Sequence, residues 1–336
     1  MRIPRWLAWG IVVLALFTSG LLRQFHADIP TSPYVSPAAG SLLFAAILIL
    51  LLVAAREHRL GASRGPGVRM GSITPLLLML LGEKWISLTL YNPAFYWIGG
   101  GDDPLPLADA HYRAFSGAGL LAAVLLLARF ATPTARQVWK RARLGLWWWA
   151  AAGTATAVLS TYAVLGGLAA ATGGEPWLAW PTVDALFGWT IVGQGLRAFA
   201  EEAYFRGLLL FELLRLAPRL GLRSLVARRW TALLLTSMLF GMEHVAVGPS
   251  FDVAIRELVF TISLGLLLGI VVVVGSNLHY AAGLHAWINW LLLGAVPRFL
   301  DPAGESLLPP GTYIGISMAL GFVVLFLTVG AGSRRK

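Results

Sequence analysis

Apolar stretches of roughly 17–25 residues alternate with short polar segments along almost the whole chain. A helix of that length crosses the roughly 30 Å hydrocarbon core of a bilayer. Stretches of this kind are residues 6–22, 38–55, 73–90, 117–131, 144–171, 230–247, 258–275, 278–296 and 313–329, of which 117–131 is the shortest. The pattern therefore predicts a helical membrane protein.

Residues 183–216 form a longer apolar stretch that contains charged side chains. At about 1.5 Å per residue a helix over this stretch would measure about 50 Å, too long for one span. We expect a short helix or re-entrant piece before about Gly195, followed by a span that carries Glu201. With this span included, the sequence predicts an all-α, polytopic transmembrane bundle of about ten spans.

Composition supports a membrane environment. Hydrophobic residues make up 57% of the 336 residues and charged residues only 12%, with a mean hydropathy of +0.73. A soluble domain carries about 25% charged residues. The chain contains no cysteine, which excludes disulfides, thiolate nucleophiles and cysteine-ligated metals.

The net charge of +10 comes from basic residues that cluster in alternate loops. The clusters are Arg56, Arg59, Arg64 and Arg69; Arg136, Lys140, Arg141 and Arg143; Arg215, Arg219, Arg223, Arg228 and Arg229; and Arg334, Arg335 and Lys336. Positively charged loops stay in the cytoplasm. The pattern predicts an integral protein of a bacterial-type inner (plasma) membrane with both termini cytoplasmic, and it argues against nucleic-acid binding.

Two adjacent glutamates interrupt the apolar stretch at residues 183–216. Ionisable residues inside a membrane mark functional sites by default. On a helix, Glu202 and Arg206 are four residues apart and share a face, so we expect an ion pair between them. Glu201 points about 100° away, and we expect no partner for it in its own helix. Glu201 is thus the carboxylate available for chemistry; the alternative is that both glutamates only hold helices together.

Two further polar pairs lie in later apolar stretches. Phe240 and His244 are four residues apart in 230–247, and His285 and Asn289 are four apart in 278–296. Each pair therefore occupies one helix face. Polar groups in a membrane bundle normally face its interior, so we expect both histidines and the asparagine to meet Glu201 there.

These residues form three spaced motifs: EExxxR from Glu201 to Arg206, FxxxH from Phe240 to His244, and HxxxN from His285 to Asn289. In this order they resemble the signature of the CAAX prenyl protease and bacteriocin-processing (CPBP, or Abi) family of intramembrane proteases. The resemblance covers residues 183–296, the expected protease core. Residues 1–182 hold N-terminal spans without a recognised motif, and 297–336 hold a last span and a basic tail.

The resemblance implies an all-α bundle whose motif helices surround a cavity in the membrane. It also implies roles for the motif residues. Glu201 would activate water, His244 would assist it, and His285 and Asn289 would stabilise the oxyanion. Glu202, Arg206 and Phe240 would support them.

The same residues allow two mechanisms. Hydrolysis without serine or cysteine needs a base for water and a donor for the oxyanion, which Glu201, His244 and Asn289 can supply. Alternatively, Glu201, His244 and His285 could hold zinc with an open fourth position. There is no HExxH motif, so both versions stay open.

Three functions fit this pattern. The first is an intramembrane endopeptidase that cleaves a membrane-associated protein or peptide. The second is a non-catalytic scaffold that regulates a partner membrane protein. The third is a proton-coupled transporter in which Glu201 and the histidines form a relay. The absence of inverted repeats and of paired broken helices argues against a transporter.

Overall fold

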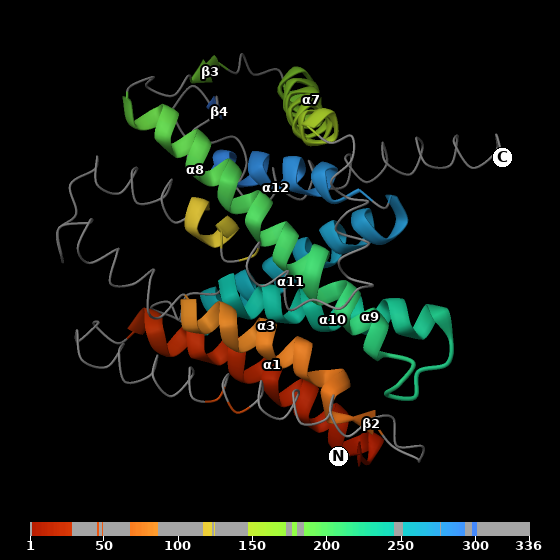
Figure 1. Cartoon of the computed structure of the whole chain (residues 1–336). Coiled ribbons are helices and arrows are strands. Elements are labelled where there is room, and N and C mark those ends of the chain that lie inside the picture. The colour runs from red at the N-terminus through yellow and green to blue at the C-terminus, as the bar shows by residue number, and fades with distance from the viewer. Residues whose placement is uncertain are drawn as a thin grey trace. The chain divides into compact units, whose positions relative to one another are not determined.

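A computed structural model describes residues 2–28, 46, 49, 68–86, 117–122, 124, 147–172, 177–179, 185–244, 251–275, 277–292 and 298–300. Of the predicted spans, 313–329 lies outside these residues and 38–55 almost entirely so. The described part is built of helices, which confirms the all-α class (Figure 1). Two small sheets of two- and three-residue strands, which the sequence pattern did not indicate, accompany them.

The chain forms two compact units. Unit 1 comprises Met1–Gly101, Ala122–Arg141 and Tyr204–Leu266, and unit 2 comprises Asp102–Leu121, Ala142–Ala203 and Leu267–Lys336. The helix that carries the glutamate pair ends inside unit 2, and the chain passes to unit 1 between Ala203 and Tyr204. Helix α11 (Phe251–Gly275) contributes residues to both units.

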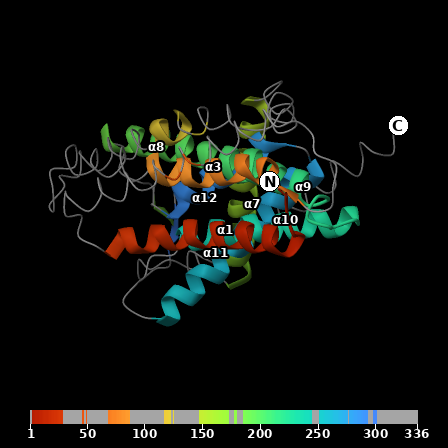
Figure 2. The ribbon, with the colours of Figure 1, turned by 60° about the horizontal axis from the view of Figure 1, so that its bottom comes forward.

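In unit 1, α1 (Arg5–Asp28) packs against α3 (Met70–Ile86) and α10 (Leu225–His244), and α9 (Leu210–Leu216) packs against α3 and α10 (Figure 2). Ala8, Val12 and Leu16 are buried at intervals of four residues, so one face of α1 meets the core. Strand β1 (Arg2–Ile3) pairs antiparallel with β2 (Val68–Arg69).

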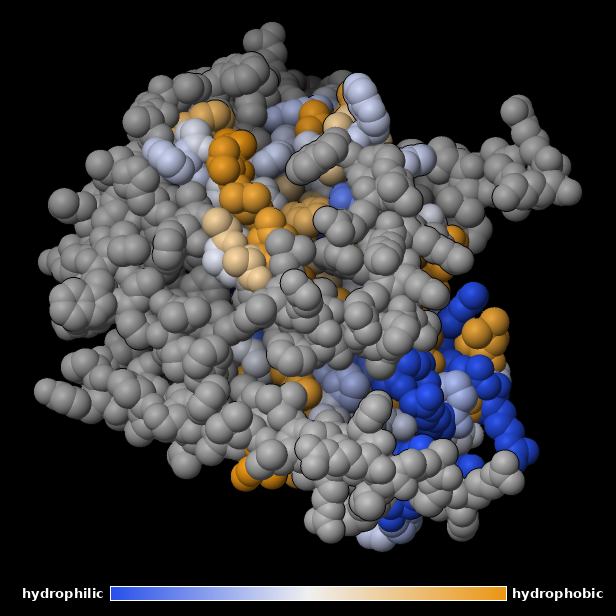
Figure 3. All heavy atoms as spheres, in the orientation of Figure 1, coloured by the Kyte–Doolittle hydropathy of each residue, from blue (hydrophilic) through white to orange (hydrophobic). Residues whose placement is uncertain are grey.

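Arginines gather in unit 1 around the turn between α9 and α10. Arg219 and Arg223 are exposed there, and hydrophilic residues cover this region in the space-filling view (Figure 3). Partial desolvation of its side chain lowers the pKa of Arg219; the positive charges of Arg215 and Arg69 act in the same direction, and the Glu212 carboxylate opposes them. This turn belongs to one of the basic loops that the sequence predicts to be cytoplasmic.

In unit 2, α12 (Leu278–Leu292) packs against α7 (Trp147–Thr172) and α8 (Ala185–Glu202). Glycines permit the close approach of α7 and α12. A Cβ atom on Gly283 would lie 2.0 Å from the Ala150 carbonyl oxygen, and one on Gly153 would lie 2.3 Å from the Tyr280 carbonyl oxygen. Strand β3 (Trp177–Ala179) pairs antiparallel with β4 (Arg298–Leu300).

The expected break near Gly195 is wrong. Helix α8 runs through Gly195, where a Cβ atom would meet only Trp290 at 3.5 Å. A glycine in a helix costs only about 1 kcal/mol relative to alanine, so packing of the helix on α12 outweighs it. The irregularity comes later, as a seven-residue π-helical segment, η2 (Ala203–Leu209), between α8 and α9. Such wider turns occur frequently at functional sites.

Within the described residues, the stretch Val253–Gly275 of α11 is long and apolar enough to cross a membrane, and Arg5–Ser19 is a shorter apolar helix. The number of about ten spans is not confirmed and stays a prediction.

Candidate active site

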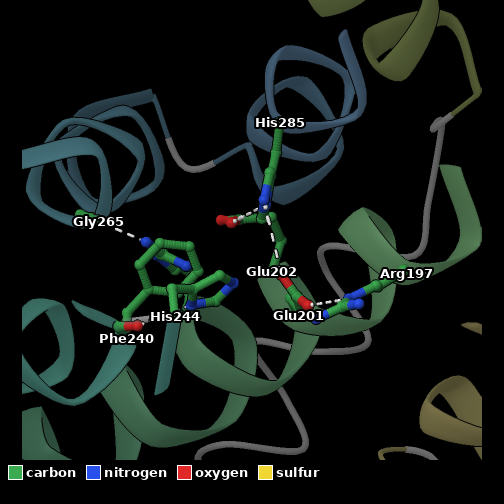
Figure 4. A network of polar contacts seen from close by, with 8 residues as sticks. Arg197, Glu201, Glu202, Phe240, His244, Gly265 and His285 are labelled. Atoms are coloured by element: carbon green, nitrogen blue, oxygen red, sulfur yellow. Dashed lines mark hydrogen bonds and ion pairs between the residues drawn. The ribbon is translucent and has the colours of Figure 1, made fainter. Parts of the chain in front are cut away.

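Glu201, Glu202 and His285 lie together inside unit 2 (Figure 4). The two glutamates are the last residues of α8, and His285 lies in the middle of α12, which packs against α8. His285 Nδ1 is 2.9 Å from Glu202 Oε1, and His285 Nε2 is 3.6 Å from Glu201 Oε2. The exposed fractions of Glu201, Glu202 and His285 are 5%, 0% and 2%.

The imidazole of His285 thus lies between two carboxylates. A carboxylate oxygen accepts, so Nδ1 donates its proton to Glu202. The 3.6 Å between Nε2 and Glu201 is too long for a direct hydrogen bond. Glu202 therefore orients the ring, and the orientation turns the second nitrogen towards Glu201.

Glu201 has a partner in its own helix, contrary to the expectation from the sequence. Arg197 Nε donates to Glu201 Oε1 at 2.7 Å, and the two residues are four apart on α8 (Figure 4). The expectation considered only the residues after Glu201, although spacing of four in either direction brings side chains onto one face. The Arg197 side chain is 34% exposed, whereas the Glu201 side chain is 7% exposed.

In unit 1, Arg206 lies buried among groups that satisfy and shield its charge. Its Nη2 donates to the Gly265 carbonyl at 3.0 Å, and its guanidinium carbon lies 4.3 Å from the centre of the Phe240 ring and 5.6 Å from that of Phe205. A guanidinium over an aromatic face is stabilised by the ring quadrupole. The aromatic residue of the FxxxH motif thus forms one wall of the arginine site.

Gly265 makes this arrangement possible. A Cβ atom there would lie 3.1 Å from the Phe240 ring and 3.3 Å from Arg206 Nη2. Nothing in the sequence pattern singled out this glycine, since it lies between Leu264 and Leu266 in a long apolar stretch.

His244 is half-buried at the C-terminus of α10 in unit 1. Its Nδ1 lies 2.7 Å from the Phe240 carbonyl oxygen, and its ring centre is 4.1 Å from that of Phe240. A carbonyl only accepts, so Nδ1 carries the proton and Nε2 is the acceptor nitrogen of the neutral ring. This is the tautomer that a histidine needs to accept a proton or a metal at Nε2.

The structure thus places the predicted residues in two groups. Glu201, Glu202 and His285 meet in unit 2, while Arg206, Phe240 and His244 meet in unit 1. Asn289 is half-buried on α12, four residues after His285. The expected pair between Glu202 and Arg206 stays a prediction, as do the catalytic roles.

The zinc interpretation named Glu201, His244 and His285 as ligands. Among the residues that the structure describes, no three His, Cys, Asp or Glu side chains form a group that could hold a metal ion. His285 directs its two ring nitrogens at carboxylates instead. Metal dependence stays a prediction.

Comparison with protein families gives one match. Residues 180–291 match the model of the Rce1-like family, described as type II CAAX prenyl endopeptidase Rce1-like. This segment is therefore similar to the Rce1-like family. The resemblance to CAAX proteases is thereby confirmed, and the matched segment contains all three motifs. No curated protein and no solved structure matches the chain.

The Rce1-like family is a protease family, so the match supports a peptidase. The segment begins just before α8 and ends within α12. It therefore includes both groups of motif residues, whereas α1, α3 and α7 lie before it.

We expect the Phe240→Leu substitution to lower the free energy of unfolding by about 1–2 kcal/mol, because Arg206 loses the aromatic face over its buried guanidinium. Thermal unfolding in detergent measures this change. Phe211→Leu, on the half-buried side of α9, removes the same ring atoms without touching Arg206 and serves as the control. Equal losses in the two variants would contradict a special role of Phe240.

Proposed function

We propose that the protein is an intramembrane endopeptidase that hydrolyses a peptide bond with water activated by Glu201. The observation that carries this proposal is the buried contact of His285 with both glutamates of the EExxxR motif. A buried histidine between two carboxylates, in a segment that matches a peptidase family, is suited to acid–base chemistry.

In the proposed reaction, Glu201 Oε2 accepts a proton from a water molecule near His285 Nε2, and the water oxygen attacks the carbonyl carbon of the scissile bond. The carbonyl oxygen becomes an oxyanion. The C–N bond then breaks, and Glu201 returns the proton to the leaving amine. One peptide bond and one water thus give a carboxylic acid and an amine.

His285 and Asn289 supply hydrogen bonds to the oxyanion in this scheme. The contact of Nδ1 with Glu202 holds the imidazole so that Nε2 faces the position proposed for the oxyanion. Asn289, one turn further along α12, offers its amide. Glu202 acts indirectly, because its hydrogen bond sets the orientation of the ring.

The resemblance to CAAX proteases also gives roles to motif residues of unit 1. His244 presents Nε2 as an acceptor and assists the water, in accordance with its tautomer. Arg206 and Phe240 support it: Phe240 contacts both the guanidinium and the imidazole.

The proposed substrate is a membrane-associated protein or peptide. The family model names prenylated CAAX substrates, and the bilayer location keeps the substrate close to the site. We further propose an integral protein of a bacterial-type inner membrane, with about ten spans and both termini cytoplasmic. The alternate basic loops support this topology.

Substrate identity tests the proposal directly. Membranes that contain the wild-type protein should yield new peptide N-termini and C-termini that membranes with Glu201→Gln lack. Mass spectrometry of terminal peptides detects these new termini. The intact form of the protein identified in this way should then be hydrolysed by the purified enzyme. If no terminus depends on Glu201 and the purified protein cleaves neither prenylated nor unmodified membrane peptides, the proposal is wrong.

The mechanism proposed here needs no metal. We expect the purified protein to keep its activity after treatment with a zinc chelator, and elemental analysis to find zinc far below one equivalent. Zinc at about one equivalent, lost together with activity, would favour the zinc version. Glu201, His244 and His285 would then be its ligands, at metal–nitrogen distances of about 2.0–2.1 Å.

A further inference from the structure

A second group of buried charges lies in unit 1 and consists of residues that are not among the predicted site residues. Lys84 Nζ is 2.8 Å from Glu83 Oε2 and 2.8 Å from Glu243 Oε1. The exposed fractions of Glu83, Lys84 and Glu243 are 5%, 3% and 7%. We call these three residues the Lys84 triad.

The triad joins a helix outside the family-matched segment to a helix inside it. Glu83 and Lys84 lie in α3, outside the segment that matches the Rce1-like family, while Glu243 lies in α10, inside it. Helix α3 also reaches the first motif, since Tyr204 donates to the Met79 carbonyl at 3.4 Å. The N-terminal part of the chain thus contacts the elements that carry two of the motifs.

Glu243 directly precedes His244, and these two residues end α10. Helix ends fray, and their last carbonyl groups have no partner within the helix. The hydrogen bond of His244 to Phe240 lies within α10, so it orients the ring but does not attach this helix end to another element. The ion pair of Glu243 with Lys84 does attach it.

Stability alone does not account for such a cluster. A buried ion pair is weak evidence for stability, because desolvation offsets the attraction and apolar replacements of similar volume are often neutral or stabilising. Charged side chains inside a membrane protein are rare and mark functional elements. The attraction between Lys84 and Glu243 can instead serve to fix the end of α10, where the catalytic candidate His244 lies.

We propose that Lys84 is a positioning residue that holds the last turn of α10, and with it His244, in the geometry for hydrolysis. This inference rests on the proposed function. It assigns a role to α3, which carries none of the three motifs. The ammonium group of Lys84 binds Glu243 and so fixes the backbone of His244, the next residue in α10.

Three variants separate positioning from stability. Lys84→Met leaves Glu83 and Glu243 without the ammonium group. Lys84→Arg keeps the positive charge. The triple variant Glu83→Gln, Lys84→Met and Glu243→Gln removes all charges at nearly constant volume. Glu257→Gln, at an exposed position of α11, is the control.

We expect Lys84→Met to lower kcat by about tenfold or more with KM changed less than about twofold, because misplacement of a catalytic group affects the chemical step. Lys84→Arg should retain kcat to within about threefold.

The triple variant should recover the thermal midpoint of the wild type but not its kcat. Recovery of both would overturn the proposal, and so would a folded Lys84→Met protein with wild-type kcat. Failure of both Lys84→Met and the triple variant to fold would also overturn it, since the triad would then be a folding element.

A second readout does not depend on peptidase activity. In protein labelled with ¹⁵N-histidine, the His244 signals, assigned with His244→Gln, should be single and sharp in the wild type and shifted or broadened in the triple variant. Unchanged signals would overturn the positioning role. A wild-type protein without any hydrolytic activity would instead disprove the proposed function, and the spectra would still decide on the role of Lys84.

Discussion

Glu201→Gln is expected to lower the rate of hydrolysis by about a thousandfold, within the range of 10²–10⁴ that general base catalysis contributes. Glutamine keeps the shape of the side chain but cannot take the proton of the attacking water. The loss should appear in kcat, because the base acts on the reacting water rather than on the bound substrate. Steady-state kinetics with a verified substrate in proteoliposomes measures the effect.

The fold should persist in this variant. Glutamine can still accept from Arg197 through its amide oxygen, and the pair with the partly exposed Arg197 contributes at most about 1 kcal/mol. Thermal unfolding and gel filtration test this point. Glu257→Gln removes one carboxylate from an exposed part of α11 and should keep full activity. Full turnover by a well-folded Glu201→Gln protein would remove Glu201 from the mechanism.

Gly283→Ala is expected to destabilise unit 2 by about 3 kcal/mol or more, at the upper end for overpacking. The added Cβ atom would meet the Ala150 backbone oxygen at 2.0 Å, and backbone atoms cannot turn aside as a side chain can. Helices α7 and α12 must then move apart, and His285 moves with α12. Activity should fall together with the thermal midpoint. Gly153→Ala, with a 2.3 Å approach to the Tyr280 carbonyl oxygen, should behave similarly.

Gly166→Ala is the matched control on α7, because a Cβ atom there meets nothing within 4 Å. Alanine is the better helix former, so this change should be neutral or stabilise by up to about 1 kcal/mol. If Gly283→Ala and Gly166→Ala had the same thermal midpoint, the close packing of α7 on α12 would be refuted.

Local patterns in the sequence predicted the helices and the motifs, because both depend on residues that are close together in the chain. Apolar stretches predicted the helices, and the motif spacing indicated the family that residues 180–291 match. The one helical prediction that failed was the break near Gly195. That prediction rested on the length of residues 183–216, which indicates an interruption but not its position; the structure has the irregular segment later, at η2.

Contacts between side chains that are far apart in the sequence could be found only in the tertiary structure. Spacing predicted that Glu202 and Arg206 share a face, but it could not indicate that Glu202 binds His285, 83 residues away. A helix face defines which side chains point together, not which helix they meet. The pair of Arg197 with Glu201 differs, because its two residues are four apart on one helix and their spacing is visible in the sequence.

The sequence by itself thus determined the helical class, the family of the central segment and the set of candidate residues, because periodicity and motif spacing are properties of neighbours in the chain. Only the tertiary structure decided that His285 lies between the two glutamates, that Phe240 covers Arg206, and that Lys84 reaches Glu243 from a helix without a motif. The physical reason is that these contacts depend on how helices pack. Close approaches such as that at Gly283 set this packing, and no pattern of apolar residues encodes them.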